Sequence, residues 1–117
     1  MCRIKILSLI LTILMVTGIY IAAAQSGNIT DLKNVTYASD YIKWTWKDPN
    51  DANFSKVMIY IDGQFKKNVS KGTRLYNATN LDQDTEYTIS THTIDKKGHI
   101  NPVWINDTAC TIVCNIS

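Results

Sequence analysis

Two histidines and the aspartate between them are the residues best suited to acid–base chemistry. His92 and His99 lie on either side of Asp95, and a general base must come within hydrogen-bonding distance of the group that it deprotonates. A turn across residues 95–99 separates the two imidazoles, so their order in the chain does not bring them together. No serine–histidine–aspartate or cysteine–histidine arrangement is suggested by position. The sequence therefore predicts a protein that is not an enzyme.

Sulfur chemistry could come from Cys110 and Cys114 near the C-terminus. In an extended strand, residues four apart are separated by about 13 Å, whereas the Cα atoms of a disulfide lie within about 7 Å. These cysteines can therefore bond to each other only if the chain turns; free thiols and an intermolecular bond are the alternatives. Two cysteines without a nearby histidine do not make a zinc-ligand set. We expect them to be small, buried residues at a strand end.

Acidic and amide side chains are concentrated in residues 48–53, where they could ligate calcium. A helix–loop–helix calcium site closes with a glutamate at its twelfth position, and no such pattern follows here. The same residue types are common in turns, because their side chains hydrogen-bond to nearby backbone groups. We predict no metal site and no cofactor.

Asparagine is the residue type whose spacing indicates a covalent modification. Seven asparagines begin N-x-S/T triplets without a central proline, the acceptor sequence for N-linked sugar. They are Asn28, Asn34, Asn53, Asn68, Asn77, Asn106 and Asn115. So many triplets in a short chain predict a glycoprotein; the alternative is that they are polar, solvent-facing strand positions without sugar.

The N-terminus has the pattern of an export signal. Arg3 and Lys5 precede an uncharged apolar run, which ends in three alanines at 22–24. This pattern predicts a signal peptide cleaved after Ala24. The alternative is a retained anchor, since residues 6–24 would form a helix of about 28 Å, nearly the thickness of a bilayer core. Either way, residues 25–117 lie outside the cytoplasm, and Cys2 is in a cytoplasmic head or is removed.

The exported part has no net charge. Arg3 and Lys5 account for the formal charge of +2, so the remaining ten basic and ten acidic residues balance. A neutral domain without a basic patch does not favour nucleic acid as a partner. Its length allows one domain.

Residues of alternating polarity predict strands after the signal. In residues 41–47, Ile42, Trp44 and Trp46 share one face while lysine and threonine share the other. Similar runs predict strands at 29–37, 54–61, 64–69, 73–80, 87–94 and 102–112, with a linker at 25–28 and a tail at 113–117. No helical pattern occurs after residue 24. Seven short strands indicate an all-β, two-sheet antiparallel sandwich at residues 29–112.

One tyrosine is expected to fix the corner of this sandwich. Tyr87 follows Leu81 and a polar turn, so its ring should enter the core and its hydroxyl should reach backbone a few residues upstream. His92 falls on the opposite face of the same strand and is expected to face solvent. The predicted core consists of Ile42, Trp44, Trp46, Val57, Ile59, Ile61, Leu81, Tyr87 and Ile89.

These residues resemble a fibronectin type III domain. Trp46 just before Asp48, the apolar strand at 57–61, and Leu81 followed by Tyr87 carry the resemblance across residues 29–112. The strands holding Trp46 and Ile89 lack the cysteines of a disulfide-linked antibody-type domain. The amino-acid sequence of residues 41–49, 57–63 and 76–81 is similar to repeats in surface proteins of methanogenic archaea. The resemblance implies a seven-stranded immunoglobulin-like β-sandwich behind the N-terminal signal or anchor helix.

The resemblance implies a scaffold and no particular ligand. The turn at 95–99 lacks the Arg-Gly-Asp motif of integrin-binding members, and the Trp-Ser-x-Trp-Ser motif of cytokine receptors is missing around Trp104.

We therefore expect a non-catalytic, exported module of the cell surface or envelope. Its roles would be structural, adhesive or protein–protein interaction, with a protein or a glycan as partner and no nucleic acid. Membrane contact would come only through residues 6–24, if uncleaved.

The alternative is a carbohydrate-binding module that uses exposed aromatics. Trp104, Tyr41, Tyr60 and Tyr37 are the available side chains, with Trp104 as the candidate ligand contact. A flat, exposed strip of Trp104 with two tyrosines would favour sugar binding, whereas burial of Trp104 would assign it to packing.

Overall fold

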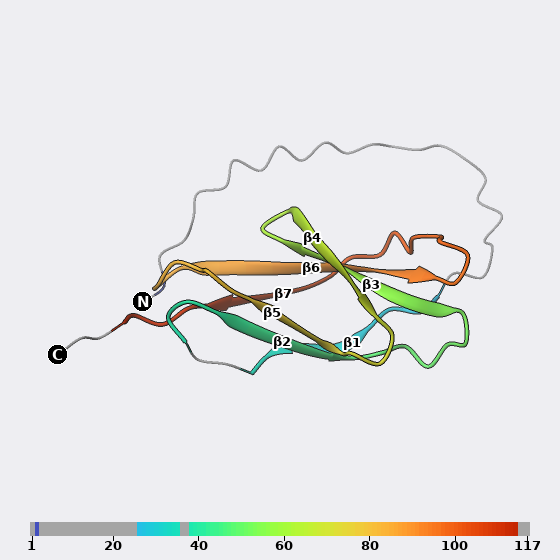
Figure 1. The fold of residues 1–117 in the computed structure, drawn as a ribbon, viewed down its shortest axis with the longest axis horizontal. Coiled ribbons are helices and arrows are strands. Elements are labelled where there is room, and N and C mark those ends of the chain that lie inside the picture. The colour runs from blue at the N-terminus through green and yellow to red at the C-terminus, as the bar shows by residue number, and fades with distance from the viewer. Residues whose placement is uncertain (1, 3–25, 36–37, 115–117) are drawn as a thin grey trace.

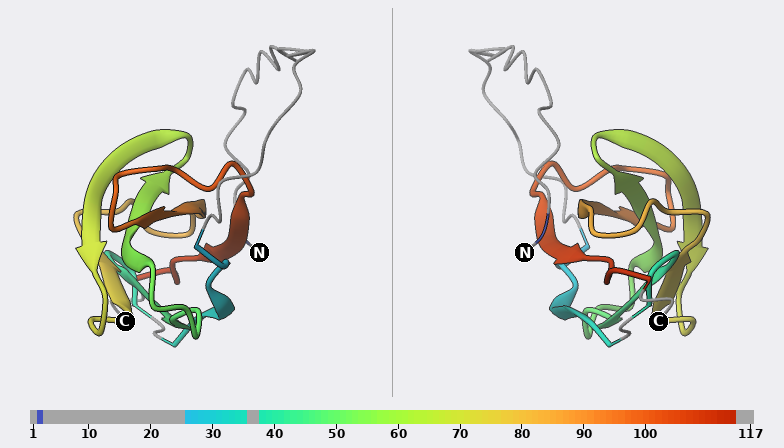
Figure 2. Two further views of the ribbon diagram at one scale, coloured as in Figure 1. Left: turned by 90° about the vertical axis from the view of Figure 1, so that its right-hand side faces the viewer. Right: turned by 90° about the vertical axis from the view of Figure 1, so that its left-hand side faces the viewer.

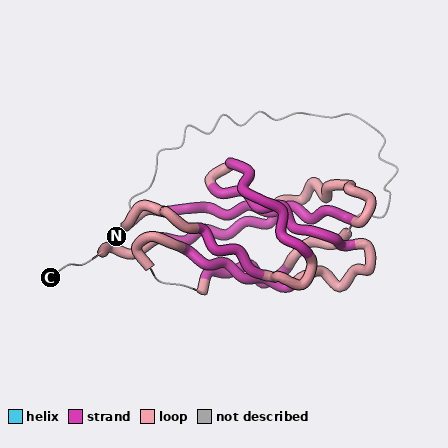
Figure 3. Tube along the Cα trace, viewed as in Figure 1, coloured by secondary structure: helices cyan, strands magenta, loops and turns pink. Residues whose placement is uncertain are grey.

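Seven strands form two antiparallel sheets in the computed structural model, which describes residues 2, 26–35 and 38–114. The strands are β1 (Thr30–Asn34), β2 (Ile42–Lys47), β3 (Phe54–Ile61), β4 (Gln64–Ser70), β5 (Leu75–Ala78), β6 (Glu86–Asp95) and β7 (Ile105–Cys110). One sheet has the order β1-β2-β5 and the other β4-β3-β6-β7 (Figure 1). The described residues contain strands and loops but no helix (Figure 3), which confirms the predicted all-β sandwich. Nor does this part of the chain offer a helix long and apolar enough to cross a membrane.

The two sheets enclose one apolar core, and the end-on views show them as facing layers (Figure 2). The alternation of β2, β3 and β6 determines which side chains enter the core, because successive residues of a strand point to opposite faces. Eight of the nine predicted core residues are buried, and Leu81 is partly buried against them. Ile29, Phe54, Val69 and Ala78 complete the cluster.

A buried side chain of one layer is hydrogen-bonded to the other layer. Trp44 of β2 is fully buried, and its Nε1 donates a hydrogen bond of 3.0 Å to Oδ2 of Asp107 on β7. A buried indole N–H needs such an acceptor, since leaving it unpaired costs about 1–3 kcal/mol. Asp107 therefore has a structural role that its polarity alone does not suggest.

β1, β5 and β7 are shorter than the strands predicted at 29–37, 73–80 and 102–112, and residues with positive φ angles bound β5 and interrupt β1. Arg74 and Asn80 have φ angles of 55° and 57°, outside the extended region, and they bracket β5. Asp31 has a φ of 56° where the register of β1 shifts against β2. Left-handed residues of this kind end or interrupt a ladder of extended backbone.

The β3–β4 hairpin closes with two residues, Asp62 and Gly63. Both have positive φ angles, 49° and 82°, as the tight turn favoured by Asp-Gly requires. Asp62 also accepts a hydrogen bond of 2.9 Å at Oδ1 from the backbone N–H of Thr88. The hairpin end is thereby attached to β6.

Residues 26–28 are held against the sandwich, which differs from the predicted linker at 25–28. Ser26 is buried, and its Oγ donates to Oγ1 of Thr93 at 3.2 Å. Asn101 Nδ2 donates to the backbone carbonyl of Ser26 at 2.8 Å. Because these polar atoms are buried and mutually satisfied, the segment is part of the folded domain.

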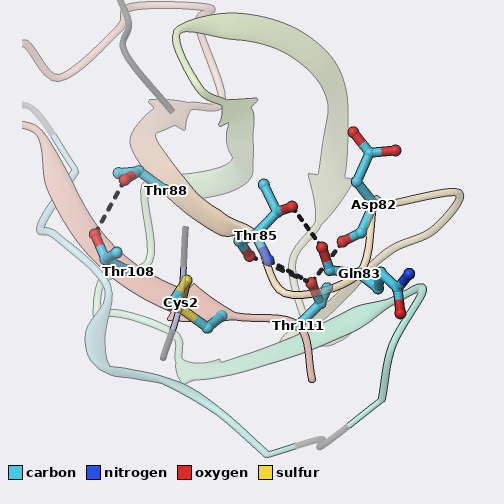
Figure 4. The surroundings of a disulfide bond; sticks show 8 residues. Cys2, Asp82, Gln83, Thr85, Thr88, Thr108 and Thr111 are labelled. Carbon is cyan, nitrogen blue, oxygen red and sulfur yellow. Dashed lines mark hydrogen bonds between the residues drawn. A yellow bond between two sulfur atoms is a disulfide. The ribbon is translucent and has the colours of Figure 1, made fainter. Parts of the chain in front are cut away.

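The cysteines differ from the expectation. Cys2 forms a disulfide with Cys110 at the end of β7, with the Cα atoms 6.1 Å apart (Figure 4). This bond places Cys2 beside the domain, which contradicts a cytoplasmic or absent Cys2. Cys110 is not a small buried residue, and Cys114 is an exposed free thiol. The predicted cleavage site after Ala24 lies outside the described residues.

Candidate functional site

The outer surface of the four-stranded sheet carries four ring side chains, of which Tyr60 contacts the other three. Tyr60 lies on β3, Phe65 on β4, His92 on β6, and Trp104 just before β7; we call this group the aromatic face. Phe65 and Trp104 are 50% and 48% exposed, whereas Tyr60 is partly buried. Large apolar side chains gathered on one surface commonly mark an interaction site.

Strand alternation and register bring these rings together. Because Ile59 and Ile61 point into the core, Tyr60 between them points outward. The two-residue turn at Asp62 pairs Tyr60 with Phe65 on β4. His92 is placed in the same way, between the buried Thr91 and Thr93 of β6.

His92 lies on the outer face, as predicted, but it is not solvent-facing. Its ring centroid is 3.5 Å from that of Trp104, and its side chain is 9% exposed. Its Nδ1 is 3.2 Å from the backbone carbonyl of Val103. The indole of Trp104 therefore covers the imidazole of His92. This contact requires the chain after the turn at 95–99 to fold back along β6. The residue pattern of β6 alone does not predict that path.

The rings do not share a plane. The Tyr60 ring lies at 77° to Trp104 and at 72° to Phe65, with centroids 5.0 and 5.5 Å apart. Tyr41 precedes β2 in the other sheet, and Tyr37 lies outside the described residues. Among the described residues, Trp104 is therefore neither buried nor part of a flat strip with two tyrosines. Edge-to-face packing of this kind stabilises a raised apolar surface.

Phe65 is the member of the aromatic face that the sequence analysis missed. A signal for it was present, because a two-residue hairpin at Asp62 fixes the cross-strand partners on either side of the turn. Counting back from the turn pairs Tyr60 with Phe65.

A second surface feature is the open seam between β4 and β5, the edge strands of the two sheets. A cavity of about 560 Å³ is lined by residues that include Ile61, Lys66 and Leu81. A neighbouring cavity of about 580 Å³ includes Asn68 and Asn77 in its lining. Tyr76 lines both, and its burial there raises the pKa of the phenol.

The acid–base residues identified in the sequence have structural partners. Asp95 is buried, and its Oδ1 accepts hydrogen bonds from the backbone N–H groups of Lys97 and His99 at 2.9 and 2.8 Å. Its Oδ2 is 3.0 Å from Nδ1 of His99. Burial would raise the Asp95 pKa, but these hydrogen bonds outweigh it and the pKa is lowered. The group stabilises a turn and does not reach His92.

The acidic loop at 48–53 also uses its carboxylates for turns. Asp48 accepts at Oδ2 from the backbone N–H of Gly72 at 2.8 Å. Asp51 accepts from the backbone N–H groups of Gly27 and Asn53 at 2.9 and 2.8 Å. The bond from Asn53 is local, as turn chemistry predicts, whereas the other two attach the loop to residues 24 positions away.

One group of potential metal ligands lies at the disulfide. Sulfur atoms of Cys2 and Cys110 and a carboxylate oxygen of Glu86 lie within 4.8 Å of one another. The two sulfurs are bonded to each other, however, and zinc binds thiolates. This group is therefore a disulfide beside a carboxylate.

The N-x-S/T asparagines occupy different environments. Asn53, Asn68, Asn77 and Asn106 are exposed. Asn28 and Asn34 are half-buried, and Asn28 accepts a hydrogen bond at Oδ1 from Asn101 at 2.8 Å. Asn115 lies outside the described residues.

Sequence comparison identifies no relative: no protein-family model matches the chain, and no curated protein sequence matches it. Solved structures do match. The sixth fibronectin type III domain of human fibronectin type III domain containing protein 3 matches with a TM-score of 0.64 and 10% identity, over 82% of this chain and 94% of that one. A two-domain fibronectin type III segment of chicken tenascin matches at 0.60 and 19% identity, over 74% of this chain and 50% of the segment.

An enzyme is also among the matches. The spore cortex lytic enzyme SleM of Clostridium perfringens matches with a TM-score of 0.65 and 10% identity, over 74% of this chain. The chain spans only 29% of that enzyme's length. At such identities the likeness shows the fold alone. The predicted corner is present, because the Tyr87 hydroxyl accepts a hydrogen bond of 2.8 Å from the backbone N–H of Asp82. This corner, the strand order and these structures together establish that this chain contains a fibronectin type III-like β-sandwich.

Proposed function

We propose that this protein is a non-catalytic, exported module that binds another protein through the aromatic face. The observation that carries the proposal is that the rings of Phe65 and Trp104, each about half exposed, both pack against the ring of Tyr60. Exposed aromatic side chains held rigidly by neighbours are the residues that contribute most at protein interfaces.

A protein partner suits this surface better than a sugar. Sugar rings stack on flat aromatic faces, but Tyr60 packs edge to face with Phe65 and Trp104, and the His92 ring lies against Trp104 with the ring centroids 3.5 Å apart. What remains exposed is an uneven apolar surface of Phe65 and Trp104, and Val103, next to Trp104 in the chain, is 47% exposed. Such a surface is complementary to aliphatic and aromatic side chains of a protein.

Export is supported by two features of the sequence and one of the structure. The N-terminal segment ends in the small residues that a signal peptidase cleaves after. Seven acceptor triplets for N-linked sugar occur in the sequence. The Cys2–Cys110 disulfide is of a kind that persists outside the cytoplasm. The structural feature differs from the expected signal in one respect, because Cys2 bonded to Cys110 lies on the exported side and not in a cytoplasmic head. The resemblance to surface-protein repeats of methanogenic archaea favours an adhesive or structural role in an envelope.

A partner can be sought among exported proteins of the source cells and then tested in purified form. The Phe65→Ala and Trp104→Ala variants should bind it more weakly than the unsubstituted chain. Truncation of an anchoring aromatic commonly costs at least about 2 kcal/mol, a loss of about 30-fold in affinity. Tyr41→Ala is the matched control, because Tyr41 is exposed on the other sheet.

Equal affinities for all four proteins would overturn the aromatic face as the binding surface. Titration with oligosaccharides separates the alternative. Saturable sugar binding that is lost in Trp104→Ala would replace the protein partner with a glycan.

A further inference from the structure

The acceptor asparagines are distributed unevenly between interior and edge strands. Each sheet has two edge strands, β1 and β5 in one and β4 and β7 in the other. Each of the four carries one acceptor asparagine: Asn34 on β1, Asn77 on β5, Asn68 on β4 and Asn106 on β7. The three interior strands carry none, although together they contain more residues than the edge strands.

Edge strands present a specific physical problem. Their outward N–H and C=O groups lack a partner strand, so an edge can pair with the edge of another molecule. Proteins usually prevent this pairing with charges, prolines, bulges or short strands. A bulky, hydrated N-linked sugar beside the edge would have the same effect by exclusion.

Exposure identifies the sites that fit best. Asn68, Asn77 and Asn106 are exposed, whereas Asn34 is half-buried. Asn68 and Asn77 both line the cavity in the seam between β4 and β5. Sugars on these two residues would cover the seam, where the edges of both sheets lie open.

The remaining edge site borders the proposed binding surface. Asn106 of β7 lies opposite Ser90 of β6, which lies opposite Tyr60 of β3. Tyr60 in turn lies opposite Phe65 of β4, so Asn106 shares a cross-strand row with these two rings. Asn68 of β4 lies opposite Met58 of β3, which lies opposite His92 of β6, so Asn68 and His92 share a second cross-strand row. The aromatic face therefore lies between two acceptor asparagines on opposite edges of one sheet.

We propose that N-linked sugars on Asn68, Asn77 and Asn106 shield the free edges of β4, β5 and β7 and leave the aromatic face between them as the open surface. The inference depends on the export part of the proposed function, because N-linked sugars are added to exported chains. It adds which sites are occupied and what the sugars do.

Site mapping is the first test. The protein is purified from its own cells, digested, and its peptides are weighed before and after enzymatic or chemical removal of N-linked sugar. We expect added mass on the peptides that contain Asn68, Asn77 and Asn106. An exported protein with these three residues unmodified would overturn the inference and leave the proposed function standing. Recovery of the protein from the cytoplasm alone would overturn both.

Self-association is the second test and separates shielding from mere modification. The triple variant Asn68→Gln, Asn77→Gln, Asn106→Gln is compared with the unsubstituted glycoprotein by light scattering. We expect the mass-averaged size of the polypeptide to increase at least about twofold, because edges then pair between molecules. An unchanged monomer would overturn the shielding role.

Two controls isolate the cause. Asn53→Gln removes the exposed acceptor in the loop before β3 and should leave the association state unchanged. Ser70→Ala removes the Asn68 acceptor triplet while keeping the asparagine, so a triple variant with Ser70→Ala in place of Asn68→Gln should associate to the same extent. Association of the Asn68→Gln triple variant but not of the Ser70→Ala triple variant would show that the amide, not the sugar, is responsible, and would overturn the inference.

Discussion

Tyr87 shows how one polar atom fixes the position of a large apolar ring. The ring is buried, and its hydroxyl accepts a hydrogen bond of 2.8 Å from the backbone N–H of Asp82. The turn that contains Asp82 is further attached to Thr111, whose Oγ1 donates to the Asp82 carbonyl (Figure 4). The start of β6 and the end of the described chain are therefore held by the same turn.

We expect Tyr87→Phe to lower the free energy of unfolding by about 0.5–1.5 kcal/mol, the usual net value of one hydrogen bond. The substitution keeps the ring and removes the acceptor of the Asp82 N–H. Chemical denaturation measures the change, and Tyr41→Phe at an exposed position is the control. Equal midpoints for Tyr87→Phe and the unsubstituted protein would contradict a stabilising corner.

Asp95 should make the free energy of unfolding depend on pH in the acidic range. Its pKa is lower in the folded protein than its ordinary value of 3.8. A carboxyl group with a lowered folded pKa stabilises the fold fully above the unfolded pKa, and this contribution is lost as the pH falls through the folded pKa. Stability should therefore decrease as the pH falls below about 4.

Asp95→Asn tests this dependence. The amide cannot ionise, so the variant should be less stable at neutral pH and should lose less stability on acidification than the unsubstituted protein. Thermal unfolding at several pH values measures both effects, with the exposed Asp40→Asn as control. Parallel pH profiles for Asp95→Asn and the parent would rule out this role for Asp95.

At the scale of elements, the β3–β4 hairpin determines the composition of the aromatic face. Gly63 has a φ of 82°, and an added Cβ there would meet no atom within 4 Å. The cost of a side chain is therefore conformational, about 1–2 kcal/mol for a residue in the left-handed region.

Gly63→Ala should be destabilising by about that amount, whereas Gly63→Asn should cost less, because asparagine tolerates left-handed backbone. Urea titration of the two variants gives the comparison. If alanine and asparagine proved equally neutral, backbone conformation would not limit this turn.

At the scale of the whole molecule, the disulfide connects the N-terminus to the last strand. Cys2 is bonded to Cys110, and Cys114 is an exposed free thiol. A thiol reagent should therefore modify only Cys114 in the unreduced protein, and Cys2 and Cys110 only after reduction. Peptide mass mapping identifies the labelled residues. Labelling of Cys110 without reductant would show that the bond is not formed.

The same experiment reports on the signal. If the chain is cleaved after Ala24 while the bond is intact, the unreduced protein should show two N-termini, Met1 and Gln25. Reduction should then release residues 1–24 as a peptide. A single N-terminus at Met1 in both states would identify a retained segment.

The sequence by itself determined the all-β class, the order of seven strands along the chain and eight of the twelve buried residues of the core. Those properties depend on the alternation of polarity and on turn residues, which are local. The strand face that Trp44 occupies follows from alternation, and the roles of Tyr87 and Asp62 follow from turns within a few positions of them. The resemblance to fibronectin type III domains rested on the same local patterns.

Only the tertiary structure decided which residues meet across sheets and strands. The burial of His92 under Trp104, the bond between Cys2 and Cys110, and the presence of acceptor asparagines on all four edges depend on strand order and on the path of the connections. Those contacts join residues distant in the chain, and no local spacing encodes them, because the free energy that selects them comes from packing the two sheets together.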